Sequence, residues 1–224
     1  MPVCNLRSVT KLTLRADAAR NREALIEAAA EAFADHGLDV PVEEIARRAK
    51  VGVGTVYRHF GGKEQLIDAI LDKRIAEMVA LAEKALAEED PWHGIVTFVV
   101  EGFEMQARDR ALKEVLLCTS RGGERIAAAR ERLAPLVRAI VTRAQRAGVL
   151  RGDVEPSDLV MLHLMLGAVA DFAGDEDPAL WRRYVPLLLR GLRPRATEGE
   201  ERPLPHPALS DERFERAMAR WHSR

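Results

Sequence analysis

Between Val51 and Lys63 the sequence gathers hydroxyl, phenol, imidazole and cationic side chains, the types that can contact phosphates and base edges. The run from Val53 to Phe60 lies between glycines and would form about two helical turns, roughly 12 Å long, which is enough to lie in a major groove. Val56 and Phe60 stand four residues apart and would pack inward together. The remaining polar side chains could reach phosphates or base edges: Thr55, Tyr57, Arg58 and His59. We therefore predict a DNA-recognition helix.

Two further helices must position this segment, and apolar spacing locates them. The first would begin between Asp17 and Asn21 and run to His36, where Gly37 ends it. The second is short and begins at Pro41, because a helix tolerates proline in its first turn. The inner faces recur at three- and four-residue spacing: Leu25, Ala28, Ala29, Ala32 and Phe33, then Val42, Ile45, Ala46 and Ala49. Helix, tight turn and helix predict a helix-turn-helix unit.

The composition favours an all-α protein. Alanine, leucine, arginine and glutamate dominate the 224 residues, and only 5% are aromatic. Hydrophobic residues make up 47%, enough for a core of useful size. Cys4 and Cys118 show no metal-ligand or disulfide spacing, and the apolar stretch Leu159–Ala170 is shorter than a membrane span and contains His163. We expect a reduced, cytoplasmic protein without a membrane partner.

The predicted helix-turn-helix segment also resembles a known family. From Ile45 to Leu66 the chain reads Ile-Ala-Arg-Arg-Ala-Lys-Val-Gly-Val-Gly-Thr-Val-Tyr-Arg-His-Phe-Gly-Gly-Lys-Glu-Gln-Leu. This segment closely resembles the DNA-binding head of the TetR family of bacterial transcriptional regulators, written around A-G-V-S-x-G-T-x-Y-x-H-F-x-x-K. The resemblance covers about residues 20–71. It implies a homodimer that binds a palindromic operator in double-stranded DNA.

The resemblance also assigns roles within the motif. Four residues fall on family positions that mostly contact phosphates: Thr55, Tyr57, His59 and Lys63. Val53, Gly54 and sometimes Tyr57 fall where the helix meets bases. Arg58 and Arg48 are additional candidates for phosphate or guanine contacts. Taken singly, Tyr57 could instead be a packed core ring and His59 a solvated surface group.

The motif departs from the family pattern at three places. Lys50 stands where the family usually has glycine, so either it adopts positive φ at some strain or the turn differs slightly. Gly52 replaces the usual serine or threonine N-cap and gives up a side-chain hydrogen bond. Pro41-Val42 replaces a Thr-Thr pair that often donates to phosphate. Weaker DNA affinity is one expected result.

Four domains follow from the pattern: a flexible basic arm over 1–14, the helix-turn-helix domain over 15–62, a helical regulatory and dimerisation body over 63–194, and a Pro-rich linker with a final helix over 195–224. A long helix from Lys63 would join head and body, so tilting it could move the head. Periodic apolar residues predict body helices over 91–108, 111–119, 124–147, 157–172 and 179–192. Ser210 would cap a last candidate helix with the apolar edge Phe214, Met218 and Trp221, which could dock on the body or across the dimer; an unordered tail is the alternative.

The helix Ser157–Phe172 is apolar almost all round and therefore needs two packing partners. By resemblance, the last two body helices pair with their copies in a four-helix bundle. The candidate interface residues are Leu162, Leu166, Val169, Trp181, Tyr184 and Leu188. A monomeric core is the alternative explanation of the same pattern.

Effector binding is the least defined prediction. The family resemblance implies a small-molecule site in the body whose occupancy releases DNA. The candidate lining residues are large and soft: Phe98, Phe103, Met105, Cys118, Met161, His163 and Met165. Ordinary helix packing explains them equally well. No cofactor, metal or catalytic motif stands out, so we predict a ligand-released repressor, with an architectural DNA-binding protein as the alternative.

Overall fold

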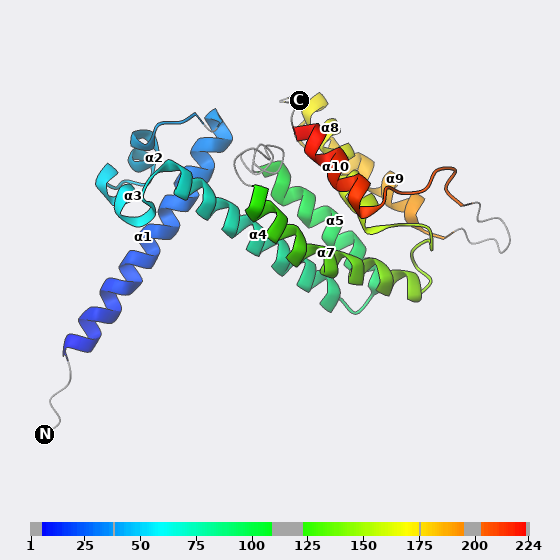
Figure 1. Cartoon of the computed structure of the whole chain (residues 1–224), viewed down its shortest axis with the longest axis horizontal. Helices are drawn as coiled ribbons and strands as arrows, with labels where there is room; N and C mark the ends of the chain where they lie inside the picture. Colours follow the sequence, from blue (N-terminus) through cyan, green and yellow to red (C-terminus); the bar gives the residue numbers. More distant parts are fainter. Residues whose placement is uncertain (1–5, 38, 109–122, 175, 195–202, 223–224) are drawn as a thin grey trace, which may run out of the picture. The chain divides into compact units, whose positions relative to one another are not determined.

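The computed structural model describes residues 6–37, 39–108, 123–174, 176–194 and 203–222. Throughout these ranges the regular elements are α-helices, which confirms the all-α prediction. The chain divides into two compact units within one helix, between Lys73 and Arg74. We call the unit that runs through Lys73 the head, and the unit that begins at Arg74 the body (Figure 1).

The head consists of α1 (Leu6–His36), α2 (Val42–Arg48), α3 (Val53–Phe60) and the first turns of α4 (Lys63–Ala87). Its core is made of the predicted inner faces together with the start of α4. The largest of these side chains are buried: Leu25, Ile26, Phe33, Ile45, Val56 and Leu66. Because α2 and α3 are too short to be stable alone, this shared core holds them in place.

Helix α1 begins earlier than the sequence predicted. It starts at Leu6 instead of at Asp17 or later, so residues 6–14, expected to form a flexible arm, are helical. No glycine or proline follows Pro2 before Gly37, and nothing in between breaks a helix. The other end agrees with the prediction: Gly37 has φ 75° and its N–H donates to the Phe33 carbonyl at 2.8 Å.

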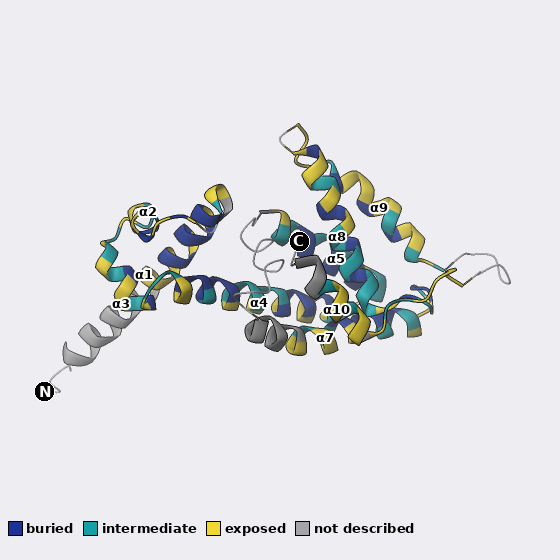
Figure 2. Cartoon of the chain, turned by 45° about the horizontal axis from the view of Figure 1, so that its top comes forward, coloured by how far each residue is buried: buried dark blue, intermediate teal, exposed yellow. Residues whose placement is uncertain are grey.

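The body contains the remaining part of α4, α5 (Pro91–Arg108), α7 (Gly123–Arg146), α8 (Pro156–Ala173), α9 (Trp181–Leu192) and α10 (Asp211–His222). Helix α5 packs against α7 and α8, and α8 packs against α9. Their inner faces are buried (Figure 2), and the largest fully buried side chains are Ile95, Phe103, Leu159 and Leu166. The helix predicted over 111–119 lies outside the described residues.

Two close contacts fix the corner between α4 and α5. The Arg143 guanidinium, on α7, donates to the backbone carbonyls of Leu86, Glu88 and Glu89 and so satisfies the carbonyl end of α4. At Gly94 the helices approach so closely that a Cβ atom would lie 2.5 Å from the Ala85 carbonyl oxygen. Any side chain at Gly94 must therefore push this corner apart.

The segment that precedes α10 is attached to the α7–α8 loop. Arg151 is almost fully buried and binds Asp153 through two hydrogen bonds of 2.8 and 2.7 Å. Asp153 Oδ2, which already accepts one of the two Arg151 hydrogen bonds, also accepts the Leu204 N–H at 2.8 Å. Arg151 and Leu204 together hold the pKa of the Asp153 carboxyl down at about 2, so this anchor stays charged at neutral pH.

By length and composition alone, α8 could cross a membrane, because its 18 residues have a mean hydropathy of 1.3. The apolar stretch is thus longer than Leu159–Ala170, which the sequence suggested. A core helix has the same composition, and α8 packs against α5, α7 and α9. Its Leu159, Leu162 and Leu166 belong to the core of the body.

Candidate nucleic-acid interface

The turn between α2 and α3 is set by two backbone hydrogen bonds. The Val51 N–H donates to the Ala46 carbonyl at 3.0 Å, and the Lys50 N–H donates to the Arg47 carbonyl at 3.1 Å. This pair is the Schellman pattern, which places the residue at Lys50 in the left-handed region. Lys50 has φ 55°, which is the first of the two alternatives expected from its place in the motif. The turn is therefore formed by a residue that is strained in it.

Helix α3 has distinct ends. Gly52 is its N-cap, with extended backbone and no side-chain hydrogen bond, which confirms the loss expected from a missing serine or threonine. Gly61 ends the helix with φ 81°, and its N–H donates to the Tyr57 carbonyl at 2.8 Å. Helix α4 then starts at Lys63. The predicted boundaries of the recognition helix are confirmed.

The two faces of α3 differ in exposure. Val56 and Phe60 are buried against the head, and the Arg22 guanidinium lies 5.2 Å from the centre of the Phe60 ring. On the other face Tyr57 is 50% exposed, so its ring is a surface group and not a core ring. The remaining predicted contact residues are exposed or half-buried: Val53, Gly54, Thr55, Arg58, His59 and Lys63.

Gly54 gives this face a point of close approach. A Cβ atom there would meet nothing within 4 Å, so its absence does not serve packing inside the head. Beside it, Thr55 is anchored by its own N–H, which donates to the Gly52 carbonyl at 2.8 Å. The Gly54 backbone is exposed, and Thr55, Tyr57, Arg58 and His59 follow it on the same helix with hydroxyl, phenol, guanidinium and imidazole groups.

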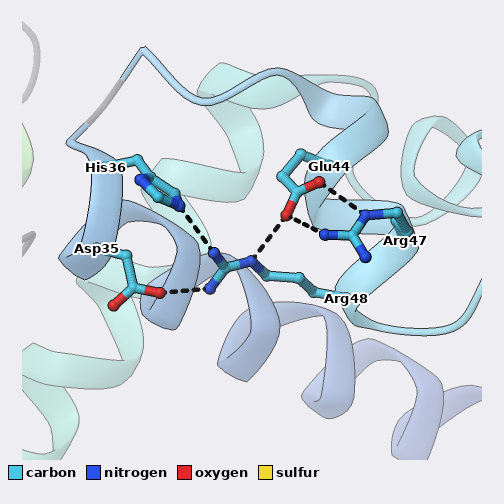
Figure 3. A network of polar contacts seen from close by, with 5 residues as sticks. All are labelled: Asp35, His36, Glu44, Arg47 and Arg48. Carbon is cyan, nitrogen blue, oxygen red and sulfur yellow. Dashed lines mark hydrogen bonds and ion pairs between the residues drawn. The ribbon is translucent and has the colours of Figure 1, made fainter.

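Arg48, the other predicted contact, lies apart from this face. Its guanidinium contacts Asp35 and His36 at the end of α1 and Glu44 on its own helix (Figure 3). This network could not be read from the sequence, because it depends on how the loop returns α2 to the end of α1. A DNA contact by Arg48 remains a prediction, and it would compete with these partners.

The predicted effector residues lie in the body but differ in accessibility. Phe98 and Phe103 are buried, while Met105, Met161 and His163 are half-buried and Met165 is exposed; Cys118 is outside the described residues. The His163 ring stacks on Phe103 and its Nε2 lies 3.2 Å from the Val99 carbonyl oxygen. Desolvation lowers the pKa of His163 to about 4, so the ring is neutral at pH 7.

Three of the six residues predicted for a dimer interface are placed inside the chain instead. Leu162, Leu166 and Trp181 belong to the body core and are buried there, because α8 turns this stripe toward α5 and α9. Val169 and Leu188 are half-buried, and Tyr184 is 38% exposed. Four large hydrophobic side chains of α8 and α9 are exposed: Met165, Phe172, Tyr184 and Leu187.

A tight-turn pair of short helices, with an exposed polar face on the second, defines a helix-turn-helix DNA-binding regulator. Residues 25–70 match the family described as bacterial regulatory proteins, tetR family, and residues 90–194 match the SbtR-like transcriptional regulator C-terminal domain. The chain belongs to the TetR family of bacterial transcriptional regulators, a non-enzymatic family.

Two solved structures match most of this chain, and a further relative matches a shorter part of it. A TetR transcription regulatory protein from Mycobacterium vanbaalenii is 35% identical, covers 81% of this chain and 99% of its own, and has a TM-score of 0.62. SmeT, the repressor of the Stenotrophomonas maltophilia multidrug efflux pump SmeDEF, is 25% identical over 82% of this chain and 97% of its own, with a TM-score of 0.58. An HTH-type regulator of Staphylococcus aureus is 38% identical over 35% of this chain, which spans only 42% of that relative.

Proposed function

We propose that this chain is a sequence-specific transcriptional repressor that binds a palindromic operator as a homodimer and leaves it when a small molecule binds the body. The exposed face of α3 carries the proposal. Val56 and Phe60 fix the helix from behind, and Tyr57 stands half-exposed beside the open backbone of Gly54. Such a regulator acts in the cytoplasm, where bacterial DNA lies.

We assign phosphate contacts to Thr55, Tyr57 and His59 on α3 and to Lys63 at the start of α4, and base contacts to Val53 and Gly54 on α3. Val53 offers only apolar contact, for example to a thymine methyl group. Arg58 is exposed on the same short helix and adds a cation for phosphate or guanine. The set combines positioning and reading groups on one surface, which sequence-specific binding requires.

The homodimer is supported by apolar surface that the single chain leaves uncovered. Phe172 is 89% exposed, Leu187 57% and Met165 46%, and Tyr184 lies on the same helix as Leu187. Helices α8 and α9 pack together, so these side chains belong to neighbouring elements. A two-fold interface through them would present two heads to the two halves of a palindrome.

Release by a small molecule is supported by relatives and by the body's composition. SmeT represses an efflux pump and has been solved as a complex with triclosan. In this chain Phe98, Phe103 and His163 form an aromatic cluster between α5 and α8. A ligand that separated these rings would shift α5 against α8 and alter the helices that lead to DNA.

DNA binding is tested by titrating the protein with a duplex from the promoter nearest its own gene and with random duplex of equal length. Specific binding should exceed random binding by several kcal/mol, whereas an architectural protein would bind both alike. Tyr57→Ala with Lys63→Ala should weaken binding to the promoter duplex, because two phosphate contacts are lost. Full affinity in this double variant would reject the proposed reading face.

The homodimer is tested by mass measurement at micromolar concentration. The wild type should be dimeric, and Phe172→Glu with Leu187→Glu should be monomeric, because two charges would be buried in an apolar contact. Glu88→Gln, which lies away from this surface on the α4–α5 corner, is the control. A stable monomeric wild type would reject the dimer.

A further inference from the structure

Arg48 joins the ends of two helices. Its Nη1 donates to Asp35 Oδ2 at 2.6 Å, and its Nη2 lies 3.0 Å from His36 Nε2, both at the end of α1. Its Nε donates to Glu44 Oε1 at 3.1 Å on α2. All three guanidinium nitrogens are thus engaged within the head, and the side chain is 22% exposed.

The neighbouring Arg47 provides a contrast on the same turn of α2. Its side chain is 73% exposed, and among the described residues it binds Glu44, on its own helix, through hydrogen bonds of 2.8 and 2.7 Å. Arg47 therefore links no two elements. The two arginines have the same charge and adjacent positions, but only Arg48 spans from α2 to α1 (Figure 3).

The carboxylates of this network are ionised at neutral pH. Arg47 and Arg48 hold the pKa of the Glu44 carboxyl down at about 2, and Arg48 lowers the pKa of Asp35. To reach a phosphate, the Arg48 guanidinium would have to leave an ionised Asp35 behind. An arginine that has no carboxylate partner can bind a phosphate without leaving a charged group unpaired.

The contact of Arg48 with the end of α1 affects α3, because Arg48 lies just before the turn that leads into α3. Arg48 is the last residue of α2, and the strained turn at Lys50 follows directly. Helix α2 has only seven residues, so its direction depends on what holds its ends. The first end is held by buried Val42 and Ile45, and the last by Arg48 on the end of α1.

We propose that Arg48 is a positioning residue for DNA recognition: it holds the end of α2 against the end of α1, so that the Lys50 turn presents α3 at the angle that reading requires. Arg48 does not bind phosphate. This inference rests on the proposed function, because it concerns how the same α3 face is aimed.

Salt dependence separates positioning from phosphate contact. Each lost phosphate contact lowers the slope of log affinity against log salt by about 0.9. Arg48→Gln should lower affinity for a duplex selected by the wild type from a random library by about tenfold, with the slope and the affinity for random duplex unchanged. Lys63→Gln, a predicted phosphate contact, should lower the slope. Arg47→Gln, the matched loss of one charge, should retain the wild-type affinity.

Asp35→Asn gives opposite predictions for the two roles. If Arg48 positions α2, losing its partner weakens specific binding although the protein becomes less negative. If Arg48 binds phosphate, the variant frees it and strengthens binding. Helical content and hydrogen exchange of the α2 amides establish that each variant is folded. If Arg48→Gln does not fold, the result for Asp35→Asn alone decides between positioning and phosphate contact.

The outcomes distinguish the two levels of the proposal. A wild type that selects no sequence from the library overturns the proposed function. A selective wild type combined with a lower slope in Arg48→Gln, or tighter binding by Asp35→Asn, overturns the positioning role alone. Weaker specific binding in both variants at constant slope supports it.

Discussion

Two helix ends in this chain, one in the head and one in the body, use the same pair of hydrogen bonds. At the end of α2 these are Lys50 N–H to Arg47 and Val51 N–H to Ala46; at the end of α7, Gly148 N–H donates to Gln145 at 2.9 Å and Val149 N–H to Ala144 at 3.1 Å. The pivotal φ angles are 55° for Lys50 and 69° for Gly148. The body places glycine there, and the head places lysine.

The comparison shows that glycine is an energetic preference at such a turn and not a condition for forming it. In both motifs a half-buried valine follows the pivot residue, and the alanine that accepts the N–H of this valine is buried. The head thus keeps a strained residue that costs about 1–2 kcal/mol, and it ties helix ends with exposed ion pairs. The body relies on glycines, a buried core and an arginine clamp. We expect the head to be the less stable region.

The largest expected effect tests how tightly the body is built. Gly94→Leu should destabilise the body by more than about 3 kcal/mol, because the new side chain would start 2.5 Å from the Ala85 carbonyl oxygen. Urea unfolding followed by segment-resolved hydrogen exchange would measure it. Gly152→Leu adds the same side chain in open space and should change little. Equal stability of the two variants would contradict the close packing of the corner.

The head and the body should lose stability at different pH values as the solution is acidified. The folded-state pKa of His163 is about 4 against an ordinary 6.5, so the unfolded chain binds the proton first and body stability falls as pH drops from 6.5 to 4, by about 3 kcal/mol at most. Because the pKa of Glu44 is lowered from an ordinary 4.5 to about 2, its ionised carboxylate stabilises the head fully above pH 4.5. This stabilisation is lost as the pH falls from 4.5 toward 2. Hydrogen exchange between pH 7 and pH 4 should show the body weakening first.

His163→Gln provides the control for that order. It removes the titrating ring, so the slope of body stability between pH 6.5 and 4 should flatten while the head is unaffected. A persistent slope in this variant would mean that another group causes the acid sensitivity of the body.

The clamp on α4 should have an intermediate effect. Arg143→Met leaves the carbonyls of Leu86, Glu88 and Glu89 without their charged donor and should cost about 2 kcal/mol in urea unfolding. Arg146→Met, an exposed arginine near the end of the same helix, should cost less than about 0.5 kcal/mol. Similar losses in both would show that the clamp adds no stability.

The smallest expected effect comes from exchanging the type of residue at the two pivot positions, Lys50 and Gly148. Lys50→Gly should stabilise the head by about 1 kcal/mol, and Gly148→Ala should destabilise the body by about as much, since a Cβ at Gly148 meets nothing and only the backbone is strained. Thermal unfolding of both variants would show shifts of opposite sign. Shifts of the same sign would reject strain as the difference between the two turns.

Local signals predicted the head well. Gly52 and Gly61 marked the ends of α3, the four-residue spacing of Val56 and Phe60 identified its buried face, and the position of Lys50 in the motif gave positive φ as one of two alternatives. Each of these depends on residues close together in the chain, where periodicity and turn geometry decide the structure.

Features that join segments far apart in the chain could not be predicted from the sequence. The Arg48–Asp35 pair requires the loop between α1 and α2 to bring two helix ends together, and nothing in the spacing encodes that. Leu162 and Leu166 were expected at a dimer contact, but an almost wholly apolar helix has no period that tells an inner face from an outer one. The start of α1 was missed because charged, non-breaking residues look alike in a helix and in an arm.

The bond from Leu204 to Asp153 sets a tether length for the last helix. The chain from Leu204 to the start of α10 at Asp211 can extend by at most about 25 Å, at 3.3–3.6 Å per residue. If α10 detached while this bond held, it would stay at millimolar effective concentration around the α7–α8 loop. A protein fused behind α10 would share that confinement, so the C-terminus is a place to hold a reporter near the body.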